Sequence, residues 1–293
     1  MTDPDTPPRP LPFTGERFTP ECVREIWYEH WHRYAFALPL ARARRVLDAA
    51  CGEGYGSALL AGVADTVLGV DRSTEAIEHA RQRYGQLPGV RFEPADVTRL
   101  DHLPDASFDL IVSLETLEHV EAQERLIDGF ARLLAPTGVL LISTPDRTVY
   151  NAQGGEPNPF HVRELERAEF EHLLAGRFAH RRLFGQKLLF ASALWSLDPP
   201  GAGASGWRID CESNGAIASG PAWPPVYYLA ACAHHGEPLA GLPGLSLFGD
   251  ADEQVYRHYD DEVRRHIAAG HRLAELEAEL TRLRAEQAAR HGQ

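Results

Sequence analysis

Lysine is almost absent from this 293-residue chain, in which Lys187 is the only one, whereas arginine and alanine are frequent. Such a bias indicates a GC-rich bacterial genome and not a chemical requirement. Positive charge is also scarce, since 29 lysine and arginine residues face 42 acidic ones and the formal net charge is −13. Phosphate contacts dominate the affinity of nucleic-acid-binding proteins and need basic patches, so this balance argues against a nucleic-acid partner.

Paired cysteines and long apolar runs are missing as well. Cys22, Cys51, Cys211 and Cys232 are scattered without C-x-x-C spacing, which argues against a zinc ribbon or a disulfide framework. No charged-then-apolar segment opens the chain, and no apolar run approaches the ~18 residues that span a bilayer. We therefore expect a cytoplasmic protein without a membrane span. Its length suits one large domain, or one domain with an appendage.

The segment from Val46 to Ser57 is the most informative in the chain. A short apolar run ends in Asp48, and glycines follow at alternate positions, Gly52, Gly54 and Gly56, before a helical pattern begins. This order predicts a buried strand, a tight turn and a helix start, where a ligand can approach the backbone closely. A nucleotide-like cofactor is the expected ligand, although a dinucleotide fingerprint would read G-x-G-x-x-G and not G-x-G-x-G.

Further predicted strands also end in acids: Asp71 follows 66–70, Asp96 follows 90–94 and Glu115 follows 108–114. Asp71 lies about 20 residues beyond the glycine turn, the distance at which an acid can hold ribose hydroxyls. The alternation of strands and helices predicts a doubly wound α/β fold with a mostly parallel sheet. Ligands of such folds bind at the carboxyl ends of the strands, where these acids fall.

The remaining pattern completes this alternation. Helices are expected from about 22 to 37, from 56, and at 74–84, 121–134 and 164–175, with further strands at 45–49, 138–143, 178–185 and 226–233. Residues 136–138 are expected as a turn before one of these strands. Residues 1–12 are expected to be disordered, 13–236 to form the domain, and 197–225 to form a long loop of functional interest that contains Trp207 and Trp223.

Residues 237–293 are expected as a helical tail. Within it Leu273, Leu276, Leu280 and Leu283 fall at the a and d spacing of a coiled coil, over about two heptads. A convincing coiled coil takes three to four heptads. The tail therefore either forms a homodimer or packs along its own domain as an amphipathic helix.

The order of glycine turn and acids resembles the class I S-adenosylmethionine-dependent methyltransferases. The resemblance implies a seven-stranded, mostly parallel, Rossmann-like sheet whose last strand is antiparallel, with an N-terminal cap helix and a C-terminal helix. It also implies S-adenosylmethionine as cofactor. The implied cofactor-binding residues are Gly52 and Gly54 at the methionine part, Asp71 at the ribose, Asp96 at the adenine amino group, and Asp48, Val97 and Leu114 nearby.

The sequence Glu115-Thr116-Leu117-Glu118-His119 is the candidate for the chemistry. Positions i, i+3 and i+4 share one face of a helical turn, so Glu115, Glu118 and His119 can point together. They could hold a divalent metal, because Mg²⁺ and Mn²⁺ prefer oxygen-rich sites and imidazole adds Zn²⁺ or Fe. Alternatively, His119 is a general base that takes a hydroxyl proton. In the plainest interpretation, the acids are solvated and His119 is a packed side chain.

The E-x-x-E-H spacing resembles the divalent-ion motif of ubiquinone-pathway O-methyltransferases and of small-RNA 2′-O-methyltransferases. In the RNA enzymes a further histidine comes from beyond the fifth strand, and His161 is its counterpart here. A metal bound by Glu115, Glu118, His119 and His161 would hold two substrate oxygens and would make His119 a ligand instead of a base.

A broader resemblance covers residues 13 to about 235. Its segments are Gly15-Glu16-Arg17, Glu29-His30, Arg33-Tyr34, Ser143-Thr144-Pro145 and Asn158-Pro159-Phe160-His161. They resemble bacterial methyltransferases of glycan-assembly and secondary-metabolite clusters, which implies O-methylation of a sugar, a glycan or a sugar-containing small molecule. By analogy, Arg33 pairs with the cofactor carboxylate and Arg17 faces the substrate, or either arginine forms a surface ion pair.

One departure from that group is Asp146, where asparagine is common, so acceptor choice is expected to differ if this position touches substrate. Two rival functions stay open. The first is a small-RNA 2′-O-methyltransferase that uses the Glu/Glu/His/His cluster, and the acidic balance weighs against it. The second is a non-catalytic assembly module that recruits partners through the leucine-spaced tail.

Overall fold

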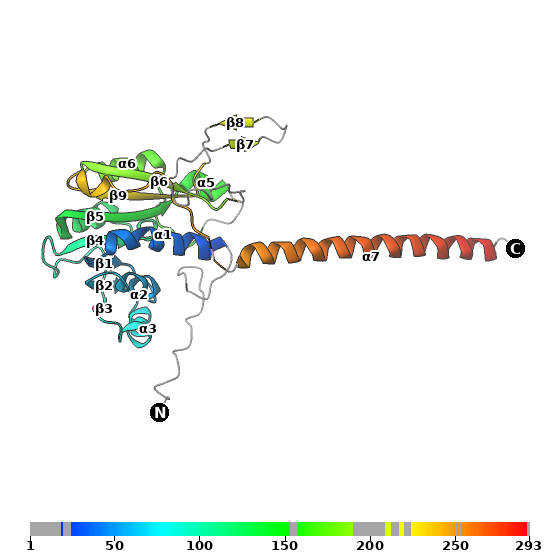
Figure 1. The fold of residues 1–293 in the computed structure, drawn as a ribbon, viewed down its shortest axis with the longest axis horizontal. Coiled ribbons are helices and arrows are strands. Elements are labelled where there is room, and N and C mark those ends of the chain that lie inside the picture. The colour runs from blue at the N-terminus through cyan, green and yellow to red at the C-terminus, as the bar shows by residue number, and fades with distance from the viewer. Residues whose placement is uncertain are drawn as a thin grey trace, which may run out of the picture. The chain divides into compact units, whose positions relative to one another are not determined.

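The computed structural model describes Thr19 and residues 25–152, 158–189, 209–211, 217–219, 224–249, 251 and 253–291. The segment 1–12, Arg17, Trp207 and Trp223 lie outside these residues. The chain divides after Ser246 into two compact units. The larger unit is built on a seven-stranded sheet with the strand order β3-β2-β1-β4-β5-β9-β6 (Figure 1).

The strands of this sheet are β1 (Arg45–Ala49), β2 (Thr66–Asp71), β3 (Val90–Pro94), β4 (Phe108–Ser113), β5 (Leu134–Pro145), β6 (His180–Gln186) and β9 (Tyr227–Ala233). The pairs from β3 to β5 are parallel. Strand β9 inserts between β5 and β6 and is antiparallel to both. The expected doubly wound, mostly parallel sheet with an antiparallel last strand is confirmed.

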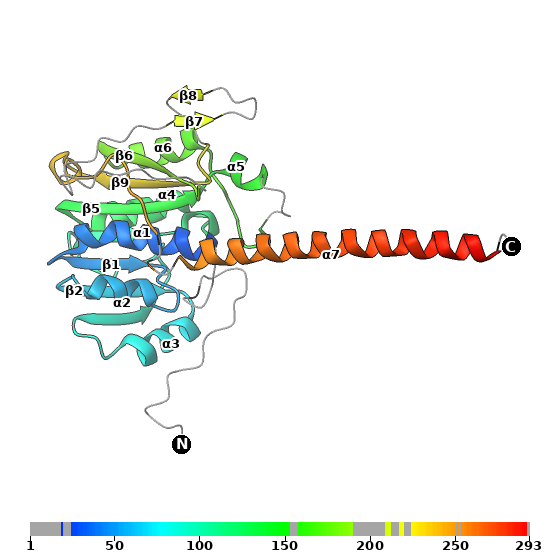
Figure 2. The same cartoon turned by 45° about the vertical axis from the view of Figure 1, so that its right-hand side comes forward.

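Helices cover both faces of the sheet, as Figure 2 shows. One face packs against α1 (Glu25–Ala41), α2 (Tyr55–Ala61) and α3 (Thr74–Tyr84) through residues such as Ala37, Leu60 and Ile77. The other face packs against α4 (Gln123–Leu133) and α6 (Arg167–Ala175) through Phe130 and Phe170. Because both faces are covered, β1 and β4 are apolar at successive positions and not at alternate ones.

Several element bounds differ from those expected. Helix α1 extends to Ala41, through Pro39, beyond the expected end at residue 37. Strand β5 begins at Leu134 and includes the expected turn at 136–138, because its pairing with β4 slips between Leu134 and Val139. The short helix α5 (Arg147–Ala152) was not expected. The loop at 197–225 contains a small antiparallel pair, β7 (Ile209–Cys211) and β8 (Ile217–Ser219).

The smaller unit contains the long helix α7 (Gln254–His291). The 3-10 turn η2 (Glu237–Leu239) lies between the last sheet strand and this helix. Within the described ranges, no helix combines the length and the apolar character needed to cross a membrane.

Candidate functional site

The glycine turn joins β1 to α2 in a conformation that most residues avoid. Gly52 and Gly54 have positive φ values of 56° and 90°, and Ala50 shares this left-handed region with a φ of 64°. A Cβ on Gly54 would lie 2.8 Å from Ala80 Cβ, and one on Gly56 would lie 2.0 Å from the Tyr34 ring. These glycines therefore permit both the turn and its close packing against α1 and α3.

Asp48 holds this turn in place through two side-chain hydrogen bonds. Its carboxylate accepts hydrogen bonds from the Ser57 hydroxyl at 2.6 Å and from the Tyr34 hydroxyl at 3.1 Å. Burial raises the pKa of Asp48 to about 6, although both hydrogen bonds act in the opposite direction. Asp48 is thus placed at the turn as expected, with each of its oxygens bonded to a protein hydroxyl.

The acids at the ends of β2 and β3 differ in their surroundings. Asp71 is buried and accepts the backbone N–H of Gly52 at 2.9 Å and that of Ser73 at 2.8 Å, which ties the turn to the second strand. The Asp96 side chain is 53% exposed, and its Oδ1 accepts from the Thr98 N–H and hydroxyl. Val97 is buried in the core, and Leu114 packs against the core on the α1 face.

Arg33 of α1 is buried, at 1% exposure, among the ends of β4, β6 and β9. Its Nη1 donates to Gln186 Oε1 at 2.7 Å and lies 3.7 Å from Glu115 Oε1, and its guanidinium lies 4.9 Å from the Tyr227 ring centroid. Its Nε and Nη2 have no hydrogen-bond partner among the described residues. Buried donors without partners cost free energy, so this position favours an anionic ligand group.

Glu115 does not share a helical face with Glu118 and His119. It has a positive φ of 49°, and the 3-10 turn η1 spans only Leu117–His119. Its Oε1 accepts the Ser143 hydroxyl at 2.6 Å and pairs with Arg33. The spacing argument failed here because it assumed a regular helix that includes residue 115.

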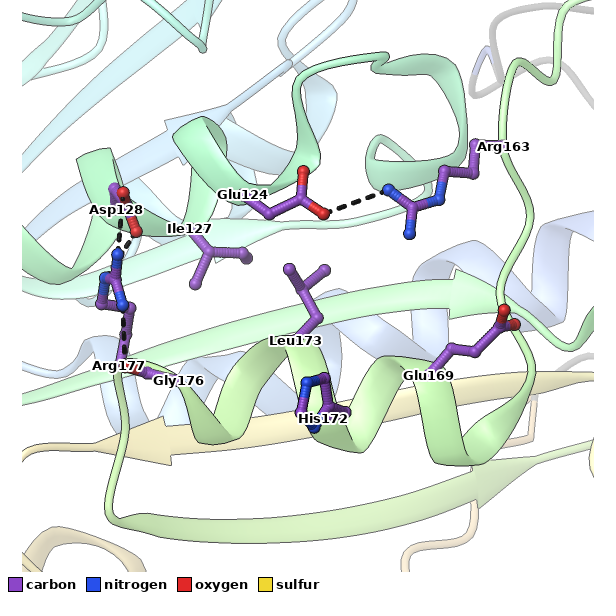
Figure 3. A pocket seen from close by; sticks show the side chains of 9 residues that line it. All are labelled: Glu124, Ile127, Asp128, Arg163, Glu169, His172, Leu173, Gly176 and Arg177. Atoms are coloured by element: carbon purple, nitrogen blue, oxygen red, sulfur yellow. Dashed lines mark hydrogen bonds and ion pairs between the residues drawn. The ribbon is translucent and has the colours of Figure 1, made fainter.

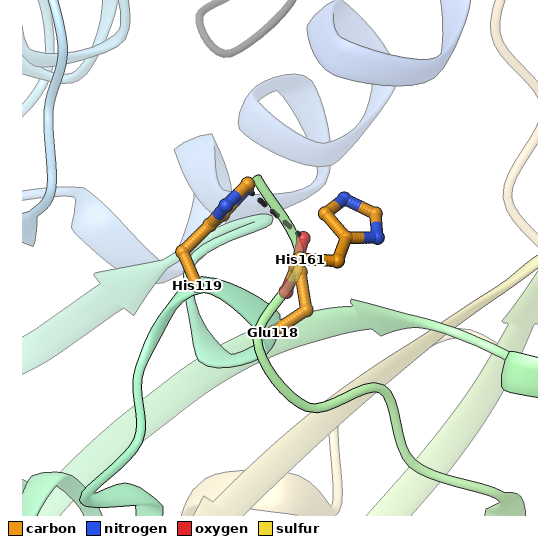
Figure 4. Close-up of side chains that lie close together, drawn as sticks. All are labelled: Glu118, His119 and His161. Carbon is orange, nitrogen blue, oxygen red and sulfur yellow. Dashed lines mark ion pairs between the residues drawn. The ribbon is translucent and has the colours of Figure 1, made fainter. Parts of the chain in front are cut away.

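Glu118, His119 and His161 come together at the carboxyl ends of β4 and β5, with one potential ligand atom from each lying within 4.8 Å of the others (Figure 4). Three of the four expected metal ligands are therefore in one group, and Glu115 is outside it. Glu118 is buried, at 1% exposure. Its pKa is raised well above the usual value, first by burial and then by the neighbouring Glu115 carboxylate.

Both histidines are oriented through their Nδ1 atoms. His119 Nδ1 donates to the Phe160 carbonyl oxygen at 2.8 Å, because a carbonyl can only accept. His161 Nδ1 lies 2.5 Å from Glu164 Oε1, and its Nε2 lies 3.0 Å from the Asn158 amide nitrogen. In the neutral form of the ring, this bond places the lone pair of His119 on Nε2, which lies 3.8 Å from Glu118 Oε1.

Two polar side chains, the buried Glu53 and the half-buried Gln186, were not singled out from the sequence. Glu53, inside the glycine turn, lies 3.0 Å from His79 Nε2 and 3.5 Å from Arg83 Nη1, both on α3. Gln186 of β6 supports Arg33 and in turn donates to the Glu29 carbonyl. The sequence signal for Glu53 was the pair His79 and Arg83, which are four residues apart on the predicted helix 74–84. They therefore share one helix face, where an acid can meet both.

Asp146 turns out to support the fold. It is buried, accepts the Tyr228 hydroxyl through Oδ2, and accepts the Val149 N–H through Oδ1 at 2.8 Å. It therefore joins β9 to the first turn of α5. Cys51 is buried as well, and burial raises the pKa of its thiol well above the usual value, which leaves it unreactive.

A groove of about 320 Å³ lies elsewhere, between α4 and α6 (Figure 3). Ile127 and Leu173 form its apolar floor, and the ion pairs Arg163–Glu124 and Arg177–Asp128 bound its ends. None of the expected site residues lines it. Its charged groups are already paired, so we assign it no role in the chemistry.

Comparison with known proteins shows the family to which this chain belongs. Residues 47–142 match the family model described as a methyltransferase domain. A probable S-adenosylmethionine-dependent methyltransferase of Mycobacterium tuberculosis is 39% identical over 223 residues, which cover 74% of this chain and 77% of that protein. A ubiquinone biosynthesis O-methyltransferase of Actinobacillus pleuropneumoniae is 35% identical over 112 residues, which cover 36% of this chain and 47% of that protein.

Among solved structures, the chain is similar to one chain in the complex of a Haloferax volcanii putative methyltransferase with the Trm112 methyltransferase activator. The TM-score is 0.52 at 19% identity, over 71% of this chain and 91% of that one. At this identity the likeness concerns the fold alone.

Proposed function

Since this chain belongs to the class I S-adenosylmethionine-dependent methyltransferases, we propose that it methylates an oxygen atom of a sugar, a glycan or a sugar-containing small molecule. The hydroxyl is the first candidate acceptor, and a phosphate oxygen is the second. One observation carries this proposal: Glu118, His119 and His161 converge at the carboxyl ends of β4 and β5, on the edge of the sheet that ends in the cofactor-binding acids. A hydroxyl acceptor must lose its proton during transfer, and this group can accept or redistribute it.

The residues around the glycine turn fit the cofactor of this family. When bound, S-adenosylmethionine supplies an electrophilic methyl group on a positive sulfonium. Asp71 holds the Gly52 N–H and retains carboxylate lone pairs for ribose hydroxyls. Arg33 has two buried donors without partners among the described residues, which suit the carboxylate of the methionine part. Asp96 is exposed at the end of β3, where it can receive an amino group.

The geometry also fits a divalent metal held by Glu118, His119 and His161. Histidines that ligate metals usually donate their second ring N–H to a carboxylate or a backbone carbonyl. His161 Nδ1 faces Glu164 in this way, and His119 donates to the Phe160 carbonyl. A metal on His161 Nε2 would replace the Asn158 amide, which lies 3.0 Å from that atom. Two imidazoles with one carboxylate suit Zn²⁺, Fe or Mn²⁺ better than Mg²⁺, which prefers oxygen ligands. A metal bound there would lower the pKa of an acceptor hydroxyl.

A second arrangement uses His119 alone. Its Nδ1 is held by the Phe160 carbonyl, so its Nε2 is the basic nitrogen and can take the acceptor proton directly. Glu115 then contributes by fixing Arg33 and Ser143 beside the same site. In either arrangement, holding the acceptor oxygen in line with the methyl group supplies most of the rate.

Oxygen is favoured as acceptor by the E-x-x-E-H spacing and by the 35% identity to a ubiquinone biosynthesis O-methyltransferase over 36% of this chain. A sugar-containing acceptor is favoured by the segments at 158–161 and 143–145 that resemble glycan methyltransferases. The net charge of −13 weighs against the small-RNA alternative, because RNA binding needs neutralised phosphates. The non-catalytic alternative is disfavoured because Gly52, Gly54 and Asp71 are all present and form one hydrogen-bonded turn.

The test is to incubate the full-length protein with methyl-labelled S-adenosylmethionine and a panel of acceptors. The panel holds nucleotide sugars, oligosaccharides, a small RNA, a carboxylic acid and a primary amine. The expected result is label in an acid-stable ether or a phosphate ester of a sugar acceptor. Label on nitrogen, on the carboxylate or on the RNA would overturn the proposed acceptor class. Calorimetry that shows no cofactor binding would favour the assembly module.

A further inference from the structure

The C-terminal half of α7 exposes a regular row of leucines. Leu273, Leu276, Leu280 and Leu283, here called the leucine stripe, have exposed fractions between 47% and 57%. They are spaced by three, four and three residues, so they occupy successive a and d positions of a heptad pattern. The surrounding residues are mainly alanine, glutamate and arginine, which are strong helix formers and give this segment a stable helical backbone.

The N-terminal half of α7 exposes a different row, formed by Tyr256, Tyr259, Val263 and Ile267. At about 100° per residue, this row lies about a third of a turn around the helix from the leucine stripe. The two rows therefore face in different directions. Whatever the first row contacts, the leucine stripe needs a surface of its own.

We infer that two copies of this chain pair through the leucine stripe as a parallel, in-register coiled coil over residues 269–287. This inference does not rest on the proposed function. The evidence for a second copy, and for its direction, comes from the charges that flank the stripe. Residues at the e and g positions decide partner choice and orientation in coiled coils.

The flanking charges are complementary in a parallel pair. With Leu273 and Leu280 at a, the g positions are Arg272 and Glu279 and the e positions are Glu277 and Arg284. In a parallel dimer each g residue faces the e residue five positions later on the other helix. Arg272 then faces the partner's Glu277, and Glu279 faces the partner's Arg284.

The antiparallel alternative places like charges together. An antiparallel pair that aligns Leu273 with the partner's Leu283 brings Glu277 opposite its own copy and Glu279 opposite its own copy. It also brings Arg272 opposite Glu286 twice, so two like-charge contacts offset two opposite-charge contacts, whereas the parallel pair has four opposite-charge contacts. Within the described chain, Glu277 and Arg284 form no ion pair, and the pairs Arg272–Glu275 and Glu279–Arg282 are exposed and weak. All four flanking residues are therefore available to a second copy at little cost.

Sedimentation equilibrium of the full-length protein tests the pairing. Because the stripe spans only about two heptads, we expect a mass of 32.5 kDa at low concentration and twice that mass at high concentration. Glu279→Arg should raise the dissociation constant at least about tenfold, because it creates two like-charge contacts. Adding Arg284→Glu should restore it. The matched control is Glu275→Arg, the same change at a position outside the interface, and it should leave the constant unchanged.

Cysteine cross-linking tests the direction. Gln287 occupies an a position, so Gln287→Cys should form a disulfide between two copies only in the parallel arrangement. In the antiparallel arrangement residue 287 faces residue 269, and only a mixture of Gln287→Cys and Ala269→Cys chains should cross-link. Cross-linking of the mixture alone, a monomer at every concentration, or equal effects of Glu279→Arg and Glu275→Arg would each overturn the inference. Circular dichroism confirms that each variant retains its helix.

Discussion

Glu53 and His79 are buried side chains that join the glycine turn to helix α3, with 3.0 Å between Glu53 Oε2 and His79 Nε2. Glu53 is completely buried and stands between Gly52 and Gly54, so any shift of its carboxylate moves the turn. Arg83, on the same helix, places its Nη1 3.5 Å from Glu53 Oε2.

Glu53→Gln should therefore lower the free energy of unfolding by about 3 kcal/mol, because it removes the buried carboxylate that faces His79 and the half-buried Arg83. Under the proposed function the turn binds the cofactor and not the acceptor, so the variant should also raise KM for S-adenosylmethionine more than it lowers kcat. The matched control is Glu93→Gln, which removes an exposed partner of His102 at 2.8 Å and should cost less than about 1 kcal/mol. Equal losses in both variants would contradict a positioning role for Glu53.

Gly56→Ala should abolish cofactor binding or folding. The new Cβ would lie 2.0 Å from the Tyr34 ring, which is held in place by its hydrogen bond to Asp48. Gly129→Ala is the control, because nothing lies within 4 Å of its Cβ position in the middle of α4. That change should stabilise the protein by about 0.5–1 kcal/mol through helix propensity. Urea unfolding and calorimetry with the cofactor measure both effects.

Asp48 should make stability fall as pH rises. Its pKa is about 6 in the folded protein, against an ordinary value of 3.8, so the folded state binds its proton more tightly than the unfolded chain does. The corresponding stabilisation is complete below pH 3.8 and is lost as pH rises through 6. Its size is about 3 kcal/mol. Unfolding of the wild type and of Asp48→Asn between pH 3.5 and 8 should differ by this slope, and parallel pH profiles would rule out the assignment.

Alanine variants of His119 and His161 distinguish a metal site from a single general base. If the three-residue cluster holds a metal, each substitution should lower kcat by roughly the same factor, of order 10² or more, and excess metal should restore part of the activity. Elemental analysis of the purified protein should show the ion, and chelator should remove activity. If His119 acts alone as a base, only His119→Ala should be strongly impaired, and chelator should have no effect.

Asp146→Ala should destabilise the protein by about 1–3 kcal/mol without changing the acceptor. It removes the partner of the buried Tyr228 hydroxyl and of the Val149 N–H. Asp146→Asn can keep both bonds and should cost less. Relative kcat/KM across acceptors should stay constant in both variants. A changed acceptor ranking in Asp146→Asn would show that this position contacts the substrate, as its departure from the related group first indicated.

The sheet could be predicted from the sequence because its signals are local. Each buried strand is a short apolar run closed by an acid or a turn, and helix α3 is bounded at 74 and 84 as its pattern indicated. Helix α5 was missed because six residues with a β-branched pair carry no helical periodicity. Strand β5 was drawn too short because a Pro-Thr-Gly sequence normally ends an element, whereas here the sheet accommodates it by a slip in register.

The sequence predicted which residues belong to the candidate site better than it predicted their arrangement. Glu118, His119 and His161 meet although more than 40 residues separate the first from the last, because β4 and β5 end at the same edge. Glu115 left this group because its backbone adopts a left-handed conformation, which residue spacing does not reveal. Arg33 depends on Gln186 and Tyr227, whose positions follow from the insertion of β9 and not from any nearby sequence pattern.

The pairing of β9 with β6 also fixes both ends of the long segment that joins these two strands. The register pairs Gln186, the last residue of β6, with Tyr227, the first residue of β9, and the Gln186 carbonyl accepts the Val226 N–H. The polypeptide between these two residues therefore leaves the sheet and rejoins it at neighbouring positions, beside the guanidinium of Arg33. Because this pairing fixes both ends, a change in the length of the segment between them need not change the register of β6 and β9.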